Sequence, residues 1–133
     1  MIGPCGVEEA QKRWRWPNFT PAEFACSCCG VVRVSEDFMD RLQAVRTRSA
    51  VPMPVSSGYR CRAHNSNVSS TGDSGPHTTG RAVDIAVSHE SAFVVLDLAL
   101  DEGFTGIGVN QKGTGRFLHL DDLENNRPRI WSY

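Results

Sequence analysis

The chain has 133 residues, of which 40% are hydrophobic and 22% charged, and this composition is that of one folded domain and excludes disorder as the main state. Fourteen Lys and Arg residues against fifteen Asp and Glu residues leave a net charge of −1, so no overall positive field attracts nucleic acid or anionic lipid. No apolar run approaches the roughly 20 residues of a membrane span. We therefore expect a monomer that binds no nucleic acid and does not insert stably into a membrane.

The first 17 residues are polar and contain two Trp residues, and we interpret them as an N-terminal extension of a domain at residues 18–133. The run Lys12–Trp16 suits contact with an anionic polymer or packing of its two indole rings on the domain, and we favour packing. The segment lacks the apolar core of a secretory signal peptide. We therefore expect synthesis in the cytoplasm.

Three helices are predicted from N-capping residues followed by apolar stripes. The first begins after Thr20, where Pro21 and Glu23 complete a Pro start and a capping box. The other two cover residues 35–49 and 88–103.

Five short apolar or alternating runs predict strands at residues 54–57, 81–87, 106–109, 116–121 and 129–133. Because helices dominate the first half and strands the second, the order indicates an α+β fold. A polar loop at residues 67–76 is long enough to suggest a functional role.

The five cysteines are Cys5, Cys26, Cys28, Cys29 and Cys61. Their odd number excludes a fully paired disulfide framework. The cluster at residues 26–29, taken together with Cys61, is compatible with reduced packing thiols, with one disulfide or with a thiolate zinc site. These three alternatives stay open at this point.

Two predicted strands carry polar residues at unusual places. Asp84 lies within an apolar strand, seven residues after His77, and a buried carboxylate needs a cation or several donors. Alternation also places His119 and Asp121 on one face of their strand. If the two strands are neighbours, His77, Asp84 and His119 meet and leave a fourth position open, as in catalytic zinc sites. Hydrogen-bonded structural roles are the alternative that spacing alone leaves open.

An ordered set of motifs makes residues 18–133 resemble the M15 zinc peptidases. The motifs are Ser57-Gly58-Tyr59-Arg60, His64-Asn65, His77-x-x-Gly80-x-Ala82-x-Asp84-Ile85, Gly103-Phe104-x-Gly106-Ile107-Gly108, Phe117-x-His119-x-Asp121, and Arg127-Pro128 followed by Trp131-x-Tyr133. The sequence looks most like the small single-domain branch, which contains D-alanyl-D-alanine carboxypeptidases, endolysins and phage-associated murein peptidases. The wider fold is shared with the hedgehog signalling domain.

The resemblance implies that His77, Asp84 and His119 bind Zn²⁺, and that Arg60 binds a substrate carboxylate or stabilises the oxyanion. It implies an α+β fold, with a small antiparallel sheet, helices on one side and the zinc site in a groove on the other. The implied activity is hydrolysis of peptidoglycan stem or cross-link peptides next to a D-amino acid, by a phage or prophage endolysin that reaches the cell wall after release. The alternatives are a cell-wall-maturation D-Ala-D-Ala carboxypeptidase and a zinc-bearing module that only binds.

The general base departs from the pattern of the family. Many relatives have Glu, Asp or His two or three residues before the last zinc ligand, where this chain has Arg116 and Phe117. Asp121 shares a face with His119, so it is our candidate base, and the alternative is that it orients a His ligand. Gly75 is a second departure, because relatives commonly have Ser there; the preceding Ser is a candidate replacement.

Two further pairs of residues are harder to assign. His64 and Asn65 follow the predicted substrate-binding Arg, and such a polar pair either caps backbone groups or lines the pocket. Trp131 and Tyr133 lie at the end of the last predicted strand. We expect both aromatic residues to close the core and not to contact substrate.

Overall fold

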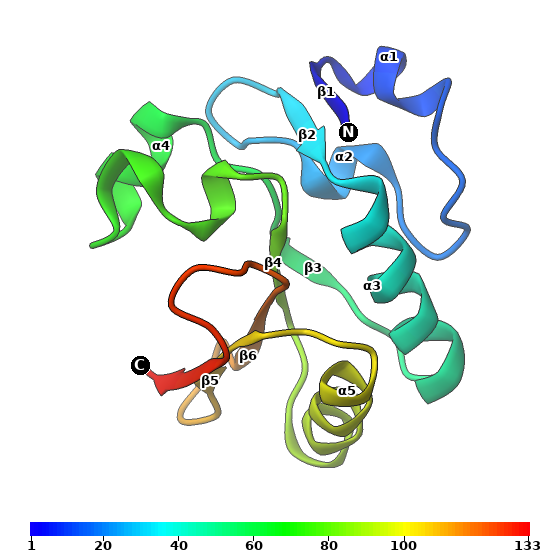
Figure 1. Cartoon of the computed structure of the whole chain (residues 1–133), viewed down its shortest axis with the longest axis vertical. Helices are drawn as coiled ribbons and strands as arrows, with labels where there is room; N and C mark the ends of the chain where they lie inside the picture. The colour runs from blue at the N-terminus through cyan, green and yellow to red at the C-terminus, as the bar shows by residue number, and fades with distance from the viewer.

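The computed structural model describes residues 1–133 and has an α+β fold with two sheets (Figure 1). The larger sheet has the strand order β3-β4-β6-β5-β7, and the smaller one pairs β1 with β2. The strands are β1 (Ile2–Cys5), β2 (Val32–Val34), β3 (Val55–Ser57), β4 (Ala82–Ile85), β5 (Gly106–Asn110), β6 (Phe117–Asp121) and β7 (Arg129–Ser132).

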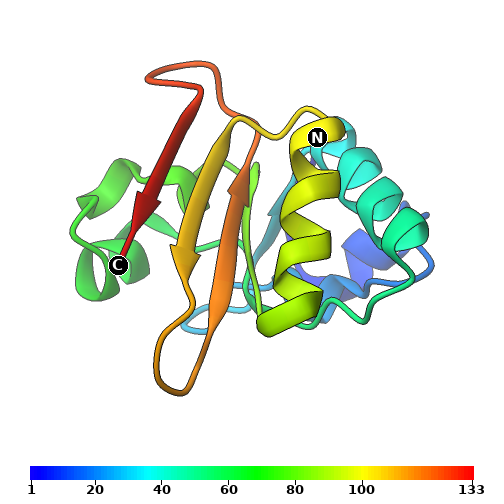
Figure 2. The ribbon, with the colours of Figure 1, turned by 90° about the horizontal axis from the view of Figure 1, so that it is seen from below.

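The helices lie on both sides of the larger sheet. They are α1 (Val7–Gln11), α2 (Pro21–Phe24), α3 (Glu36–Ser49), α4 (Arg62–Val68) and α5 (His89–Asp101), with two 3₁₀ turns at Gly72–Ser74 and Pro76–Thr78. Figure 2 shows α3 and α5 together on one side of the sheet and α4 on the other. None of the helices has both the length and the apolar character that crossing a bilayer requires.

The three predicted helices are confirmed as α2, α3 and α5. At α2, the backbone N–H of Thr20 donates to the Glu23 carboxylate at 2.7 Å, as a capping box requires. At α3, the Ser35 hydroxyl accepts from the backbone N–H of Phe38. The sequence did not predict β1, α1, β2 or α4, which are short elements.

The five predicted strands are confirmed, but the sheet is not wholly antiparallel. β5 pairs with β7 in parallel, with Ile107 opposite Ile130. β6 runs antiparallel to β5 and therefore ends beside the start of β5. The connection at residues 122–128 crosses that end of the sheet, so β7 begins there and runs in the direction of β5. The expectation of an antiparallel sheet is corrected at this strand.

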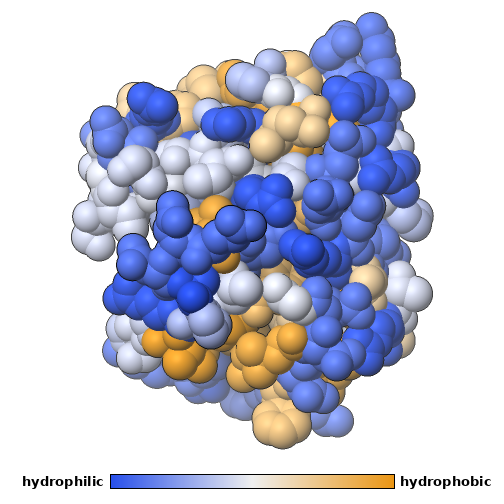
Figure 3. All heavy atoms as spheres, viewed as in Figure 1, coloured by the Kyte–Doolittle hydropathy of each residue, from blue (hydrophilic) through white to orange (hydrophobic).

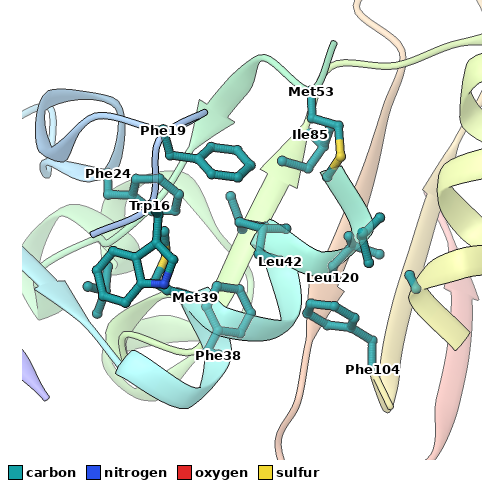
Figure 4. Close-up of a cluster of buried hydrophobic side chains, with 14 of the residues drawn as sticks. Trp16, Phe19, Phe24, Phe38, Met39, Leu42, Met53, Ile85, Phe104 and Leu120 are labelled. Atoms are coloured by element: carbon teal, nitrogen blue, oxygen red, sulfur yellow. The ribbon is translucent and has the colours of Figure 1, made fainter. Parts of the chain in front are cut away.

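The core fills the space between the larger sheet and the helices (Figure 4). Val83 and Ile85 of β4 and Leu118 and Leu120 of β6 point into it, as the predicted alternation requires. The polar residues that alternate with them therefore face the opposite side of the sheet, away from α3 and α5. Figure 3 shows that the outer surface in this view is mainly hydrophilic, with smaller hydrophobic areas.

Residues 1–17 pack on the rest of the chain. Ile2 and Trp16 are buried, and the Trp16 indole N–H donates to Asp40 at 2.8 Å. β1 extends β2 as its antiparallel partner. The expected packing of the Trp residues is thus confirmed for Trp16, while the domain boundary at residue 17 stays a prediction.

We predict that Leu42→Ala lowers the free energy of unfolding by about 2–5 kcal/mol, because it leaves a cavity between α3 and the sheet. Leu42 is 0% exposed and Leu100 is 58% exposed. Leu100→Ala is therefore the matched control and should change stability by less than about 0.5 kcal/mol. Urea denaturation followed by circular dichroism measures both. Equal losses in the two variants would contradict this packing.

Candidate metal centre

The pairing of β4 with β6 sets Asp84 directly opposite His119. Both side chains lie on the face of the sheet that points away from the core. His77 reaches the same place from the 3₁₀ turn Pro76–Thr78, which precedes β4. The three side chains are buried, with exposed fractions of 5% for His77, 7% for Asp84 and 2% for His119. Three residues from distant parts of the sequence therefore meet, as the sequence predicted.

The ligand atoms of these residues are spaced as a tetrahedral zinc site requires. His77 Nε2 and His119 Nδ1 each lie 3.2 Å from Oδ1 of Asp84. All three ligand atoms lie within 4.8 Å of one another. Zinc bonds of about 2.0–2.1 Å in a tetrahedron separate neighbouring ligand atoms by roughly 3.3 Å. The three residues therefore fit a zinc ion without rearrangement of the backbone.

The other nitrogen of each imidazole ring has its own acceptor. His77 Nδ1 donates to the backbone oxygen of Gly58 at 2.8 Å, and His119 Nε2 donates to Asp121 at 2.7 Å. With those nitrogens protonated, the lone pairs of His77 Nε2 and His119 Nδ1 face the Asp84 carboxylate. Three electron-rich atoms that face one another need a cation between them.

The pKa shifts show the same preference for positive charge. Burial alone would raise the pKa of Asp84, but the His119 and His77 imidazoles, which donate to it when they carry a second proton, hold it well below its usual range. Burial alone would lower the pKa of His119, but its hydrogen bonds to Asp121 and Asp84 raise it. The site therefore keeps its carboxylate ionised and attracts a proton or a metal ion to the imidazole.

Asp121 lies on the far side of the His119 ring from Asp84 and is 0% exposed. Arg127 donates to both of its oxygens, at 2.9 Å and 2.8 Å. Burial would raise the pKa of Asp121, but the hydrogen bonds from His119 and Arg127 lower it to about 2. This geometry favours the alternative in which Asp121 orients His119, and its role as general base stays a prediction.

Two glycines of β5 make room for this arrangement. A Cβ atom at Gly106 would overlap the carboxylate of Asp121. A Cβ atom at Gly108 would lie 2.7 Å from the Trp131 indole nitrogen and 2.9 Å from Cβ of His119. The Gly106-Ile107-Gly108 motif therefore leaves space on the metal side of the sheet, while Ile107 packs in the core.

Arg60 lies beside the candidate metal ligands. Its backbone N–H donates to the carbonyl of His77 at 3.0 Å, which ties the two segments together. Its side chain donates to Ser57 at 3.1 Å and to Asn65 at 3.2 Å, and one terminal nitrogen lies 3.5 Å from Oδ2 of Asp84. The guanidinium is thus fixed next to the metal site, with N–H groups left for another acceptor.

These residues face a groove of about 660 Å³. Its lining includes the three candidate ligands and Arg60. The other lining residues come from the end of α4 and the segment that follows it, from the start of β6, and from the last seven residues of the chain: Val68, Ser69, Ser70, Thr71, Pro76, Phe117, Arg127, Arg129, Trp131, Ser132 and Tyr133. Trp131 and Tyr133 therefore line the groove, and the expectation that they close the core is wrong. The parallel addition of β7 at the sheet edge, which the sequence did not predict, places them there.

His64 and Asn65 do not line the groove. Asn65 is buried and donates to Thr71 at 2.9 Å and to the backbone of Gly72, so it holds the loop after α4. His64 Nε2 lies 3.0 Å from the Ser27 hydroxyl. Asn65 therefore binds a backbone group, which is one of the two alternatives stated for the pair, whereas His64 contacts a side chain and fits neither.

The close packing of this loop also accounts for Gly75. A Cβ atom there would overlap the hydroxyl of Thr71 and lie 2.8 Å from the amide nitrogen of Asn65. A Ser at this position would displace the loop. The neighbouring Ser74 is exposed and makes no hydrogen bond to the metal residues, so it does not replace the Ser that relatives have.

Comparison with protein families gives one match. The family profile described as Peptidase M15 matches residues 17–121, which is most of the chain. The chain belongs to the peptidase M15 family. It is therefore a member of a family of zinc-dependent metallopeptidases related to peptidoglycan. No curated protein matches the chain.

The M15 match includes the three candidate ligands and Arg60, and it ends at Asp121. Arg127 and β7 lie beyond it. Sequence reasoning named Arg127 only as part of a motif and assigned it no role. The signal that would have assigned it a role is the buried Asp121, which needs a cationic partner in addition to His119.

We predict that Asp121→Asn weakens zinc binding by about 10–100-fold, because the variant loses the charged acceptor that orients His119. Competition with a fluorescent chelator measures the affinity. Asp122→Asn is the matched control, since Asp122 pairs with Arg81 and Arg41 and does not contact His119. Unchanged zinc affinity in Asp121→Asn together with lost hydrolysis would instead support Asp121 as the general base.

Proposed function

We propose that this M15 protein is a zinc-dependent peptidase that hydrolyses stem or cross-link peptides of peptidoglycan next to a D-amino acid. The observation that carries the proposal is the convergence of His77, Asp84 and His119 at the wall of a groove, with Arg60 fixed beside them. A bound zinc ion at these residues would activate water and polarise the amide carbonyl. The protein's own part is to hold the ion, to bind the peptide and to exclude bulk water.

The cationic lining of the groove supports a substrate that carries carboxylates. Arg60, Arg127 and Arg129 all line it, and Asp84 is the only carboxylate among the lining residues. The negative charge of Asp84 is balanced by the cation that the metal site requires. The negative charge of Asp121 balances the positive charge of Arg127. Arg60 and Arg129 therefore remain to attract an anionic group. Peptidoglycan stem peptides offer such groups, and Arg60 is placed to bind one beside the scissile amide or to stabilise the oxyanion.

The aromatic wall of the groove supports an extended peptide as the ligand. Trp131 lies with its ring centre 5.0 Å from that of His119, and the Tyr133 ring lies 5.0 Å from that of Phe117. Apolar side chains or methyl groups of a peptide would pack on these rings while its polar groups face the arginines. Such a mixed lining is typical of sites that orient a ligand.

The groove lining has no carboxylate other than Asp84 that could serve as general base. Asp84 would be engaged by the metal, and Asp121 is buried behind His119. This observation favours, as a second candidate function, a zinc-bearing module that binds peptidoglycan peptides without cleaving them. The bond cleaved distinguishes an endopeptidase from a cell-wall-maturation D-Ala-D-Ala carboxypeptidase.

We further propose that the enzyme acts on the bacterial cell wall as a phage or prophage endolysin, after release from the cytoplasm. The support is the likeness of its motifs to the single-domain branch of the family. The substrate partner is then the peptidoglycan peptide, with no nucleic acid or membrane partner and with the monomer as the active form.

We predict that purified peptidoglycan incubated with the zinc-loaded protein releases new peptide fragments, which mass spectrometry identifies. The fragments should be absent after chelation and in His119→Ala, because both remove the metal from the groove. Loss of a terminal D-Ala would indicate a carboxypeptidase, and cuts within the stem or cross-link an endopeptidase. A zinc-bound protein that releases no fragment would favour the binding module.

We predict that Arg60→Ala lowers kcat/KM for the released bond by about 100–1000-fold, because the variant loses a fixed cation at the reacting carbonyl or at the substrate carboxylate. Arg62→Ala is the matched control, since Arg62 is exposed on α4 and does not line the groove. Zinc content should stay at the wild-type level in both variants. Equal activity of the two variants would remove Arg60 from the proposed mechanism.

A further inference from the structure

A second cluster of metal-ligating side chains lies outside the groove. Cys26, Cys28 and Cys29 lie in the turn between α2 and β2, and Cys61 is the N-cap residue of α4. The four sulfur atoms lie within 4.8 Å of one another. Since Cys61 lies 35 positions after Cys26, the fold itself brings the sulfur atoms together.

The spacing of the sulfur atoms matches that of a metal-thiolate centre. Cys28 Sγ lies 3.5 Å from Cys26 Sγ and 3.3 Å from Cys61 Sγ. Zinc–sulfur bonds of about 2.3 Å in a tetrahedron separate neighbouring sulfur atoms by roughly 3.8 Å. A shift of a few tenths of an ångström would therefore accommodate an ion.

Backbone N–H groups point at the same sulfur atoms. The N–H of Cys61 donates to Cys26 Sγ at 3.4 Å, and the N–H of His64 donates to Cys61 Sγ at 3.4 Å. Such donors stabilise the thiolate form of sulfur, which is the form that binds a metal ion.

The turn is built to present three sulfur atoms together. The N–H of Gly30 donates to the carbonyl of Cys26 at 2.7 Å, and the N–H of Cys26 donates to the carbonyl of Val31 at 2.8 Å. Gly30 has a φ of +75°, which favours glycine and closes the turn. The sequence Cys26-Ser-Cys-Cys-Gly30 therefore folds into a compact loop that surrounds one point.

A single disulfide explains this cluster less well than a metal ion does. A disulfide joins two sulfur atoms and needs no others, but here four converge. It would leave two further thiols close to the bridge with no role. Cys5 is not part of this cluster. The chain therefore has five cysteines, of which four are available to bind one ion.

We propose that Cys26, Cys28, Cys29 and Cys61 form a second, structural zinc site. Each sulfur binds the ion as a thiolate, so every one of these cysteines that is still protonated releases its proton to solvent as the ion binds. With four protein ligands the centre has no open position, as is typical of structural and not catalytic zinc. The inference rests on these cysteines and is independent of the proposed peptidase activity.

The ion would fasten the segment that carries Arg60 to the α2–β2 turn. Cys61 follows Arg60 directly, and the backbone there already packs closely, since a Cβ at Gly58 would lie 2.5 Å from Cα of Phe24. The N–H of Tyr59 donates to the carbonyl of Phe24 at 2.9 Å. The cysteine site would therefore help to fix one end of the groove without contacting its ligand.

The test is the zinc content of the full chain, purified with a non-thiol reductant, loaded with zinc alone and desalted. Elemental analysis should give about two zinc ions per chain for the wild type and about one for Cys28→Ser/Cys29→Ser, which changes only exposed side chains. Cys5→Ser is the matched control and should keep both ions. His77→Ala should lose the other ion, so failure at the groove and failure at the cysteines give different results.

A second measurement uses the wild type alone, in case the variant does not fold. A mercurial reagent that binds thiolates should release about one zinc ion per chain to a coloured chelator. Equal zinc content in the wild type and Cys28→Ser/Cys29→Ser would overturn the proposal. So would an intact mass that shows the loss of two hydrogens to a disulfide in the reduced, zinc-loaded protein.

Discussion

The buried carboxylate of Asp84 is the constraint on which the rest of the site depends. An ionised group with an exposed fraction of 7% is stable only where positive charge or donors surround it. Here it faces two imidazole nitrogens at 3.2 Å and a guanidinium at 3.5 Å. The neighbouring elements serve this requirement, because the β4–β6 register supplies His119, the turn before β4 supplies His77 and the segment before α4 supplies Arg60.

A second set of contacts fixes the orientation of the ligands. Gly58 holds the ring of His77, and Asp121 holds that of His119 with Arg127 behind it. In this arrangement the nitrogens that face the metal site differ, Nε2 in one residue and Nδ1 in the other. The donor geometry brings together the same three residues that the motif resemblance predicted. Each ligand has a partner that fixes its tautomer, as is usual for zinc-binding His residues.

Much of this was predictable from local patterns. Capping residues predicted α2, α3 and α5, and alternation along β4 and β6 put Asp84, His119 and Asp121 on the polar face. Alternation gives the face of a strand but not the direction of a side chain, so it did not reveal that Asp121 turns to His119 and Arg127. It also did not predict β7 beside β5, since strand order depends on contacts across the fold. Trp131 and Tyr133 were misplaced for that reason.

We propose that Nε2 of His77, Nδ1 of His119 and an oxygen of Asp84 hold one zinc ion in the groove. Anomalous X-ray scattering at the zinc edge, measured on crystals of the zinc-loaded protein, tests it most directly. An ion bound as proposed should give a peak about 2.0–2.2 Å from each of these three atoms. A peak bonded to Nε2 of His119, or no peak beside Asp84 in zinc-loaded crystals, would contradict it.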